Sequence, residues 1–500
     1  MSRETGHEKD ASDRERRIGK RRSESPARRL RDSWQEPPRG RARLRIPRPL
    51  YDVMKADLRR PHAFAAERVG FLFVGGGNAE GGEVLAIGAE YRSVADDHYV
   101  EDWRSGARIN GDAIRAAMQH VLDTGRGAFH VHLHDHPGVP GFSGMDRDEQ
   151  PRLVRSLRNV GRDVPHGMLV LSDDSAAAWV WLPGEEVPIV PGQVTIVGYP
   201  TALIVPRTVN NARRRAAPTP NDDLASDARN GRFSRQTFLG VGAQAVLERA
   251  RLGVVGLGGG GSHIVQQLSH LGVRHFRVFD GDTVDESNLN RLVGARAADV
   301  RRRTAKTTVA KRLITGLTPR AKVEAHAGRW QERPELLRGC DVVFGCVDTF
   351  AERRELEVAC RRFGMAYVDI GMDVHQVGEG PPRMAGQVIL SVSGGPCMFC
   401  LGFLNDARLA QEAALYGAAG GRPQVVWPNG VLASTAVGVA VDVLTGWTRT
   451  DPPTVYLSYD GNTGLVTPHV RLHYLDAEPC PHYPLEAAGA PVFRRVRSPT

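Results

Sequence analysis

The chain has 500 residues, 41% of them hydrophobic, which is enough for two or three domains that each bury a core. No run looks long and apolar enough to cross a bilayer, and the polar, basic N-terminus lacks the apolar region of a secretory signal. The six cysteines are few for this length. Together these features argue against a membrane protein and against a disulfide framework, and they predict a cytoplasmic protein.

The net charge of +9 is concentrated near the N-terminus. Residues 1–45 contain 15 Lys and Arg against 8 Asp and Glu, so this segment alone has a surplus of +7 and the remaining chain only +2. Its richness in Arg, Ser, Glu and Pro predicts a disordered arm over residues 1–45. The arm is a solubilising tail or a salt-sensitive tether to an acidic partner. Because the excess charge is not on a folded face, no nucleic-acid binding is expected.

Residues 46–206 alternate short apolar runs with turns, which is typical of an α+β domain with a central sheet. The pattern predicts one helix at 112–124 and strands at 71–76, 83–91, 128–134, 167–172, 176–182 and 201–206.

A histidine motif marks one of these strands. His130, His132, His134 and His136 alternate with other residues, so on a strand they share one face, and Asp146 can fold back toward them. Two imidazoles and one carboxylate make a catalytic zinc site with an open position for water. Four histidines exceed what one such site needs, and the alternative is a set of structural histidines with an unrelated aspartate.

The order HxHP followed by SxxD resembles the signature of the JAMM (JAB1/MPN/Mov34) metalloproteases. The resemblance implies that His134, His136 and Asp146 bind zinc, that Ser143 helps to hold the oxyanion, and that Glu67 is the general base. The gap between His136 and Ser143 is one residue shorter than in the eukaryotic enzymes. His130 and His132 are extra to the signature and are interpreted as packing residues or as supports for the ligands.

Residues 207–230 have no apolar periodicity and are rich in Ala, Asn, Asp, Pro and Arg. They are expected to be a linker between two independently folded domains.

The stretch from Arg251 to Arg291 predicts a strand, a glycine turn, a helix and a second strand. Gly256, Gly258 and Gly261 keep the GxGxxG spacing, which lets backbone N–H groups at a helix N-terminus approach a phosphate. Asp280, at the end of the second strand, can hold a ribose. A nicotinamide dehydrogenase would use the same elements, but the polar SNLNR segment at 287–291, Lys306 and Asp348 argue against it.

With these motifs, residues 231–485 resemble the ThiF superfamily, which includes the adenylyltransferases that activate sulfur carriers and the ubiquitin-activating enzymes. The resemblance implies a Rossmann-like α/β domain over residues 231–500 that binds ATP with Mg²⁺. It places Gly256, Gly258 and Gly261 at the phosphates, Asp280 at the ribose, Asn288, Arg291 and Lys306 at the triphosphate, and Asp348 at the magnesium. Arg235 would reach the ATP of the partner in a homodimer. Leu292 stands where the family usually has Gln.

A second metal site is indicated by the CxxC pair Cys397 and Cys400. The second half of the family's structural zinc site is usually another CxxC, and here the corresponding place holds Cys480 and His482. Cysteine and histidine both suit tetrahedral zinc, and the alternative is ordinary free thiols.

Residues 401–479 contain no cysteine, so the thioester-forming cysteine of some ubiquitin-activating enzymes is missing. Cys340, Cys346 and Cys360 are interpreted as small buried apolar residues. The resemblance therefore implies an enzyme that passes its acyl-adenylate to another protein.

The predicted fold class is α/β, with an N-terminal α+β JAMM-like domain at 46–206 and a C-terminal ThiF-like domain at 231–500. The two domains together imply a bifunctional enzyme that cleaves a ubiquitin-like or sulfur-carrier protein after its C-terminal glycine and then adenylates that glycine. One alternative is activation of a small carboxylate or a tRNA base by the ATP site. Another is a non-catalytic module that binds the tail of a ubiquitin-like protein.

Overall fold

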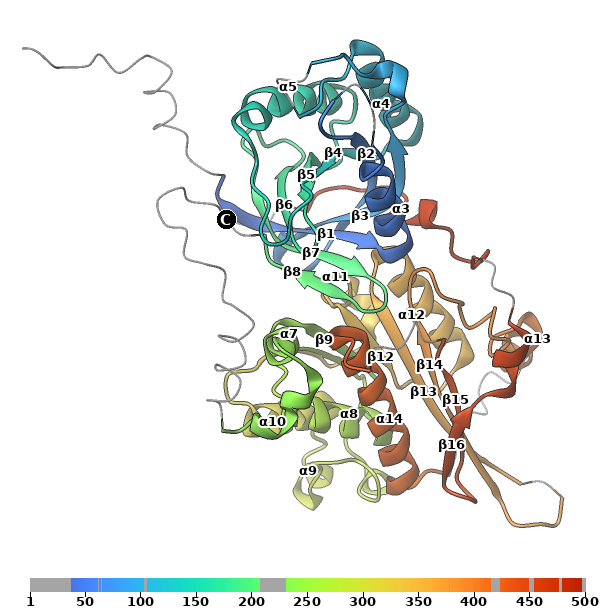
Figure 1. Cartoon of the computed structure of the whole chain (residues 1–500). Helices are drawn as coiled ribbons and strands as arrows, with labels where there is room; N and C mark the ends of the chain where they lie inside the picture. Colours follow the sequence, from blue (N-terminus) through green and yellow to red (C-terminus); the bar gives the residue numbers. More distant parts are fainter. Residues whose placement is uncertain are drawn as a thin grey trace, which may run out of the picture. The chain divides into compact units, whose positions relative to one another are not determined.

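The computed structural model describes residues 37–61, 63, 65–102, 106–206, 231–376, 378–414, 423–448, 454–475 and 479–496. Two eight-stranded sheets follow one another along this chain (Figure 1). We call residues 39–206 the first half and residues 231–496 the second half. The expected linker at 207–230 lies outside the described residues, as does the expected arm up to residue 36.

The first sheet has the strand order β6-β5-β4-β2-β3-β1-β7-β8 and mixes parallel with antiparallel pairs. Its strands are β1 (Arg39–Pro47), β2 (Val69–Asn78), β3 (Val84–Ser93), β4 (Gly127–Leu133), β5 (His166–Leu171), β6 (Ala176–Trp181), β7 (Val190–Val197) and β8 (Ala202–Ile204). All six expected strands have a counterpart in this sheet, whereas β1 and β7 were not anticipated.

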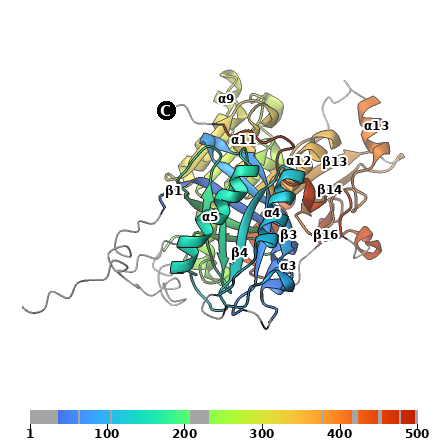
Figure 2. The ribbon, with the colours of Figure 1, turned by 90° about the horizontal axis from the view of Figure 1, so that it is seen from above.

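Helices cover both faces of this sheet. Their bounds are α3 (Arg48–Leu58), α4 (Gly111–Thr124) and α5 (Gly144–Val160), and Figure 2 shows α4 and α5 side by side. Alternation along β2 explains the two layers: Leu72 packs with α3, whereas Phe71 and Phe73 pack with α4. Helix α4 begins where the Asn110 side chain accepts two backbone N–H bonds and ends at the left-handed Gly125.

Strand β1 begins inside the segment expected to be disordered. That expectation is corrected for residues 39–45, because arginines alternate there with apolar residues. Leu44 and Ile46 lie in the core of the first half, while Arg43 and Arg45, on the opposite face, are also buried. β1 has the basic composition of a disordered arm but the two-residue period of a strand, because another part of the protein covers its arginine face.

The second sheet has the order β11-β10-β9-β12-β13-β14-β15-β16. The strands from β11 to β13 are parallel, as in a Rossmann-like fold, and β14 to β16 add antiparallel pairs. Their bounds are β9 (Arg251–Val255), β10 (His275–Phe279), β11 (Lys322–His326), β12 (Val342–Gly345), β13 (Ala366–His375), β14 (Arg383–Ser391), β15 (Tyr456–Asp460) and β16 (Leu465–Pro468). The helices are α7 (Ala243–Arg249), α8 (Gly259–His270), α9 (Ala297–Arg301), α10 (Lys306–Leu317), α11 (Pro334–Arg338), α12 (Phe350–Phe363), α13 (Asp406–Ala414) and α14 (Val426–Thr445).

Helix α14 is long and apolar enough to cross a membrane by length and composition, contrary to the expectation from the sequence. In the structure it packs along α8 and β13. Leu432, Ala436 and Val443 are buried in the core of the second half. Its apolar surface is thus used inside the protein, as in a core helix.

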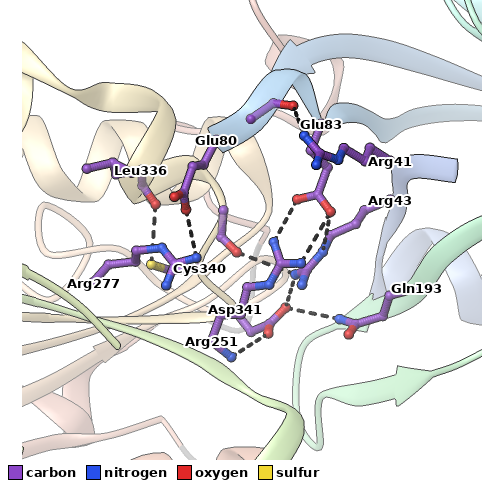
Figure 3. Close-up of polar contacts among 12 residues, drawn as sticks. Arg41, Arg43, Glu80, Glu83, Gln193, Arg251, Arg277, Leu336, Cys340 and Asp341 are labelled. Carbon is purple, nitrogen blue, oxygen red and sulfur yellow. Dashed lines mark hydrogen bonds and ion pairs between the residues drawn. The ribbon is translucent and has the colours of Figure 1, made fainter. Parts of the chain in front are cut away.

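The described residues of both halves belong to one compact unit, which begins at Arg39. A group of charged residues joins them, which we call the buried junction: Arg43 and Glu83 of the first half, and Arg251 and Asp341 of the second (Figure 3). Arg43 lies 3.1 Å from the Asp341 carboxylate, and Arg251 lies 2.7 Å from that of Glu83. Arg45, fully buried, donates 2.7 Å bonds to the carbonyls of Cys340 and Phe363.

A C-terminal strap, residues Leu485–Arg495, returns from the second half to the first. Its Ala490 N–H donates to the carbonyl of Gly76 in β2 at 2.8 Å, and Phe493 enters the core of the first half. A Cβ at Gly76 would lie 2.4 Å from the Phe493 ring. A Cβ at Gly75 would lie 2.2 Å from the Ala488 carbonyl oxygen, so Gly75 and Gly76 make room for the strap, which explains why this buried strand contains them.

We expect Phe493→Ala to lower the free energy of unfolding by about 3 kcal/mol, because it leaves a cavity in the core of the first half. Urea unfolding followed by circular dichroism measures the loss. Val492→Ala is the matched control, since Val492 is 73% exposed and Phe493 only 9%. Equal losses in the two variants would contradict a core role for Phe493.

Candidate functional site

The histidines lie at the carboxyl end of β4. Phe129 and Val131 face the core of the first half, and the alternate residues His130 and His132 face the other side and are buried. The strand ends at Leu133 and the chain bends over residues 135–138, so His136 leaves the strand direction.

Strand register brings Glu67 to the histidines. Val69 of β2 is paired with His132 of the antiparallel β4, so Glu67, two residues earlier, comes beside His134. The closest oxygen of Glu67 lies 3.9 Å from Nε2 of His134. The ligand atoms of Glu67, His132 and His134 all lie within 4.8 Å of one another, and we call these three residues the histidine cluster.

Asp146 lies beside this cluster at the start of α5. Its Oδ2 is 3.7 Å from Nε2 of His132 and also accepts the backbone N–H of Ser143 at 2.7 Å. In return the Ser143 hydroxyl accepts the Asp146 N–H, which completes a capping box. Gln150, buried one turn later, donates to Oδ1 of Asp146 at 2.6 Å. Asp146 and Gln150 are four residues apart, so on a helix they lie on the same face. This spacing could have predicted the contact, but the sequence interpretation did not use it.

His136 does not join the cluster. Its side chain is exposed and its Nδ1 lies 2.8 Å from the Pro137 carbonyl oxygen. The structure brings the ligand atoms of His132 and His134 together with that of Glu67. The assignment of His136 as a ligand stays a prediction from the motif, and its ring centroid lies 5.8 Å from that of His134. The strand stops at Leu133, so His136 lies beyond the strand alternation that the sequence interpretation extended to it.

The surroundings of the cluster suit metal binding. Burial lowers the pKa of His132 to about 3 and also lowers the pKa of His134, so both rings are neutral at pH 7, the form that binds a metal. Burial, aided by the Asp146 carboxylate, raises the pKa of Glu67 to about 7. A carboxyl group that titrates near neutrality suits a general base.

The glycine turn, residues Gly256–Gly261, links β9 to α8. Gly256 has a φ of +86°, and a Cβ at Gly261 would lie 1.9 Å from the Gly256 carbonyl oxygen. Both positions therefore require glycine. Gly258 is the N-cap residue of α8, where free backbone N–H groups can receive a phosphate.

Asp280 lies against this turn, and Lys306 lies beside Asp280. One oxygen of Asp280 accepts the N–H of Leu257 at 2.7 Å, and Nζ of Lys306 lies 4.0 Å from the other oxygen and 2.7 Å from Asp282. Burial raises the pKa of Asp280, while Lys306 and two backbone N–H groups oppose this shift. The arrangement puts the Lys306 cation beside the Asp280 carboxylate, and it puts this carboxylate, which can accept a hydrogen bond from a hydroxyl group, against the glycine turn.

The chain just after the SNLNR segment contacts the first turn of α8. Val293 N–H donates to the Ser262 hydroxyl, Asn288 is buried, and Arg291 donates to the Ser287 carbonyl. Leu292, which replaces the usual glutamine, is buried in a small apolar cluster with Val284 and Val309.

Asp348 lies in an exposed position after β12, and the preceding Cys346 is hydrogen-bonded to Val255 next to the glycine turn. Arg353, buried in an ion pair with Asp369, donates to the carbonyl of Val347 and so holds this loop. Sequence reasoning did not identify Asp369, whose partner lies on a different element.

Arg235 is exposed on a short 3₁₀ helix, Ser234–Leu239, at the far end of α8 from the glycine turn. Gln236 donates to the Leu271 carbonyl there, and α8 is roughly 18 Å long. The structure therefore does not bring Arg235 to the glycine turn of its own chain.

The four predicted structural ligands, Cys397, Cys400, Cys480 and His482, lie together, and we call them the cysteine cluster. Cys400 Sγ is 3.6 Å from Sγ of both Cys397 and Cys480, and His482 Nδ1 is 3.4 Å from Cys400 Sγ. Tetrahedral zinc with bonds of about 2.3 Å to sulfur separates its ligands by roughly 3.7 Å, so the set fits zinc. The buried Glu357 accepts the Met398 N–H and the Tyr483 hydroxyl, and so fixes both segments.

Comparison with known proteins places the second half. Residues 233–481 match the ThiF family. The chain is 33% identical over 175 residues to the SAMP-activating enzyme E1 of Haloferax volcanii, covering 34% of this chain and 61% of that protein. It is 32% identical over 179 residues to the adenylyltransferase and sulfurtransferase uba4 of Aspergillus terreus, covering 34% and 36%.

Among solved structures, that of E. coli MccB with ATP is 18% identical, with a TM-score of 0.41, and the match covers 51% of this chain and 74% of that one. The chain spans from about a third to three-fifths of the length of the two curated relatives. The family match begins after the histidine strand, so the JAMM-like nature of the first half stays a prediction. Residues 233–481 of this chain therefore form a ThiF-family domain.

Proposed function

We propose that the second half adenylates the C-terminal glycine of a ubiquitin-like or sulfur-carrier protein, and that the first half cleaves a precursor or conjugate of the same carrier after that glycine. The observation that carries the adenylation is the position of Asp280 in a ThiF-family domain: it accepts the Leu257 N–H of the glycine turn, and Lys306 lies 4.0 Å from its other oxygen. The names of two relatives, a SAMP-activating enzyme and a sulfurtransferase, support a carrier protein as the substrate.

In the adenylation, a carboxylate oxygen of the carrier attacks the α-phosphorus of ATP. The new P–O bond forms as the bond to pyrophosphate breaks, which gives an acyl-adenylate. Lys306, Arg291 and the N–H groups of the glycine turn neutralise the charge that develops on the phosphates. Mg²⁺ held on the Asp348 side would add charge neutralisation of the same kind.

Three features support a homodimer that releases its acyl-adenylate to another protein. Arg235 lies near the C-terminal end of α8 and therefore too far from the glycine turn of its own chain. On the same 3₁₀ helix, Phe238 is 66% exposed, as expected for an interface with a second copy. Cys340 and Cys360 are fully buried and burial raises the pKa of both thiols, so neither suits a thioester. We place the enzyme in the cytoplasm.

The proposed cleavage is a hydrolysis at the histidine cluster. His132, His134 and Asp146 would hold zinc, which supplies polarisation of the water and of the substrate carbonyl. Glu67 takes a proton from the water as the water oxygen bonds to the carbonyl carbon. Glu67 then passes that proton to the leaving nitrogen when the C–N bond breaks. The Ser143 hydroxyl, which accepts from Asp146, keeps its own proton to donate to the oxyanion.

ATP–pyrophosphate exchange separates this proposal from the alternatives. Exchange that depends on a ubiquitin-fold protein ending in Gly-Gly supports a carrier, whereas exchange with a small acid points to activation of small carboxylates. Absence of both exchange and cleavage would leave a binding module for the carrier tail.

We expect Lys306→Ala to reduce carrier-dependent exchange by about 100-fold or more, because the variant loses a cation at the triphosphate. Lys311→Ala is the matched control: this lysine is exposed on the same helix, α10, and its loss should leave the exchange rate unchanged. Equal rates for the Lys306→Ala variant and the wild type would remove the basis for an ATP site here.

Metal analysis of the purified protein should find two zinc ions per chain. His132→Ala should release one ion and Cys480→Ser the other, because each variant removes a ligand of a different cluster. His136→Ala tests the ligand choice: we expect it to keep both ions. Loss of one ion in His136→Ala, with retention in His132→Ala, would favour the pair inferred from the sequence motif.

Glu67→Gln should keep the zinc of the histidine cluster but lower cleavage of a carrier with a C-terminal extension by about 100-fold or more, because the amide cannot accept the proton. Cleavage is followed by mass spectrometry, with zinc content measured on the same sample. Full cleavage by this variant would show that Glu67 is not the base.

A further inference from the structure

The two halves meet at the amino end of the second sheet. Arg251 is the first residue of β9, and Asp341 immediately precedes β12; both belong to the buried junction (Figure 3). The glycine turn and Asp348 follow the carboxyl ends of the same two strands. Since β9 rises about 3.3 Å per residue, five residues put roughly 17 Å between the junction and Gly256.

In the first sheet the contact lies at one end of β2 and the histidine cluster at the other. Gly76 receives the strap, and the β2–β3 connection carries Glu80, which lies 2.7 Å from Arg277 of the second half. Val69, at the opposite end of β2, is paired with His132. Seven residues of strand, roughly 23 Å, separate Val69 from Gly76.

The halves are joined in a way that opposes hinge movement between them. The buried junction engages β1 and β3, and the β7–β8 turn adds a further contact, because Thr201 N–H donates to the Val443 carbonyl of α14. Gln193 of β7 donates to Asp341, and the strap crosses back to β2. Rotation about any one of these contacts would break the others, several of them buried.

We infer that cleavage and adenylation take place in separate binding events, with the processed carrier released from the first half before it binds the second. The histidine cluster and the glycine turn lie on opposite sides of the contact between the halves, and both strands lead away from that contact. The two strand lengths add to roughly 40 Å. An extended chain spans at most about 3.6 Å per residue, so a carrier tail shorter than about eleven residues cannot present its glycine to both sites of one chain from one binding position. The inference rests on the proposed function and adds the order of its steps.

A chase experiment tests this order. Isotope-labelled precursor, a ubiquitin-fold protein with a short extension after Gly-Gly, is mixed with the full-length enzyme, ATP and a large excess of unlabelled mature carrier. We expect labelled mature carrier to appear free in solution, and labelled acyl-adenylate to fall in proportion to the excess. Labelled acyl-adenylate that persists undiluted would mean direct transfer, within one chain or between two, and would overturn the inference.

A mixing experiment gives a second readout. Equal amounts of the Glu67→Gln and Lys306→Ala full-length variants are compared with wild type at the same concentration of each intact site. Separate binding events predict the wild-type rate of acyl-adenylate formation from precursor, whereas direct transfer within a chain predicts a large loss. Controls keep the two proposals apart: if Lys306→Ala cleaves no precursor, or Glu67→Gln adenylates no mature carrier, the proposed function itself fails.

Discussion

The arrangement of the whole molecule depends on one buried carboxylate, that of Asp341. It is 3% exposed and accepts bonds from Arg43 of β1, Gln193 of β7 and the backbone N–H of Arg251 in β9. A buried carboxylate without such partners is costly, and removing one partner of a buried pair destabilises more than the pair itself contributes. Because two partners come from the first half and one from the second, Asp341 is satisfied only when the halves are together.

Sequence periodicity predicted several strands of each half, but it missed β7, whose Val194 and Ile196 lie in the core of its own half, and it missed β1, whose covering residues are distant in sequence. β4 and β9 were found because apolar residues dominate them or alternate along them. Most of β1 was assigned to a disordered arm, because its arginines suggest a solvent-exposed segment. In the fold, Arg43 and Arg45 are buried against Cys340, Asp341 and Phe363, which lie some 300 residues away in the sequence. The same limit hid the strap: no local pattern tells that Phe493 fills the space above Gly76.

The candidate sites show where motif spacing suffices and where strand geometry is needed. The cysteine cluster assembles as its motif implies, and Lys306 at the start of α10 comes within 4.0 Å of Asp280, because short turns and helix starts set these positions. For the histidines, the motif alone could not give the ligand pair. The register of β2 against β4 decides which imidazoles meet Glu67, and because β4 ends at Leu133, His136 lies beyond the strand with its ring centroid 5.8 Å from that of His134.

The cysteine cluster has a structural consequence beyond its own loop. Cys480 and His482 lie directly before the strap, and Tyr483 is bonded to the buried Glu357, which also holds the Met398 N–H. Zinc at the cluster would fix the first residues of the strap to the second half, while Ala490 and Phe493 fix its later residues to β2 of the first. Metal binding in one half is therefore linked to the packing of the other. A strap that zinc already holds at its first residues loses less conformational entropy when its later residues pack against β2.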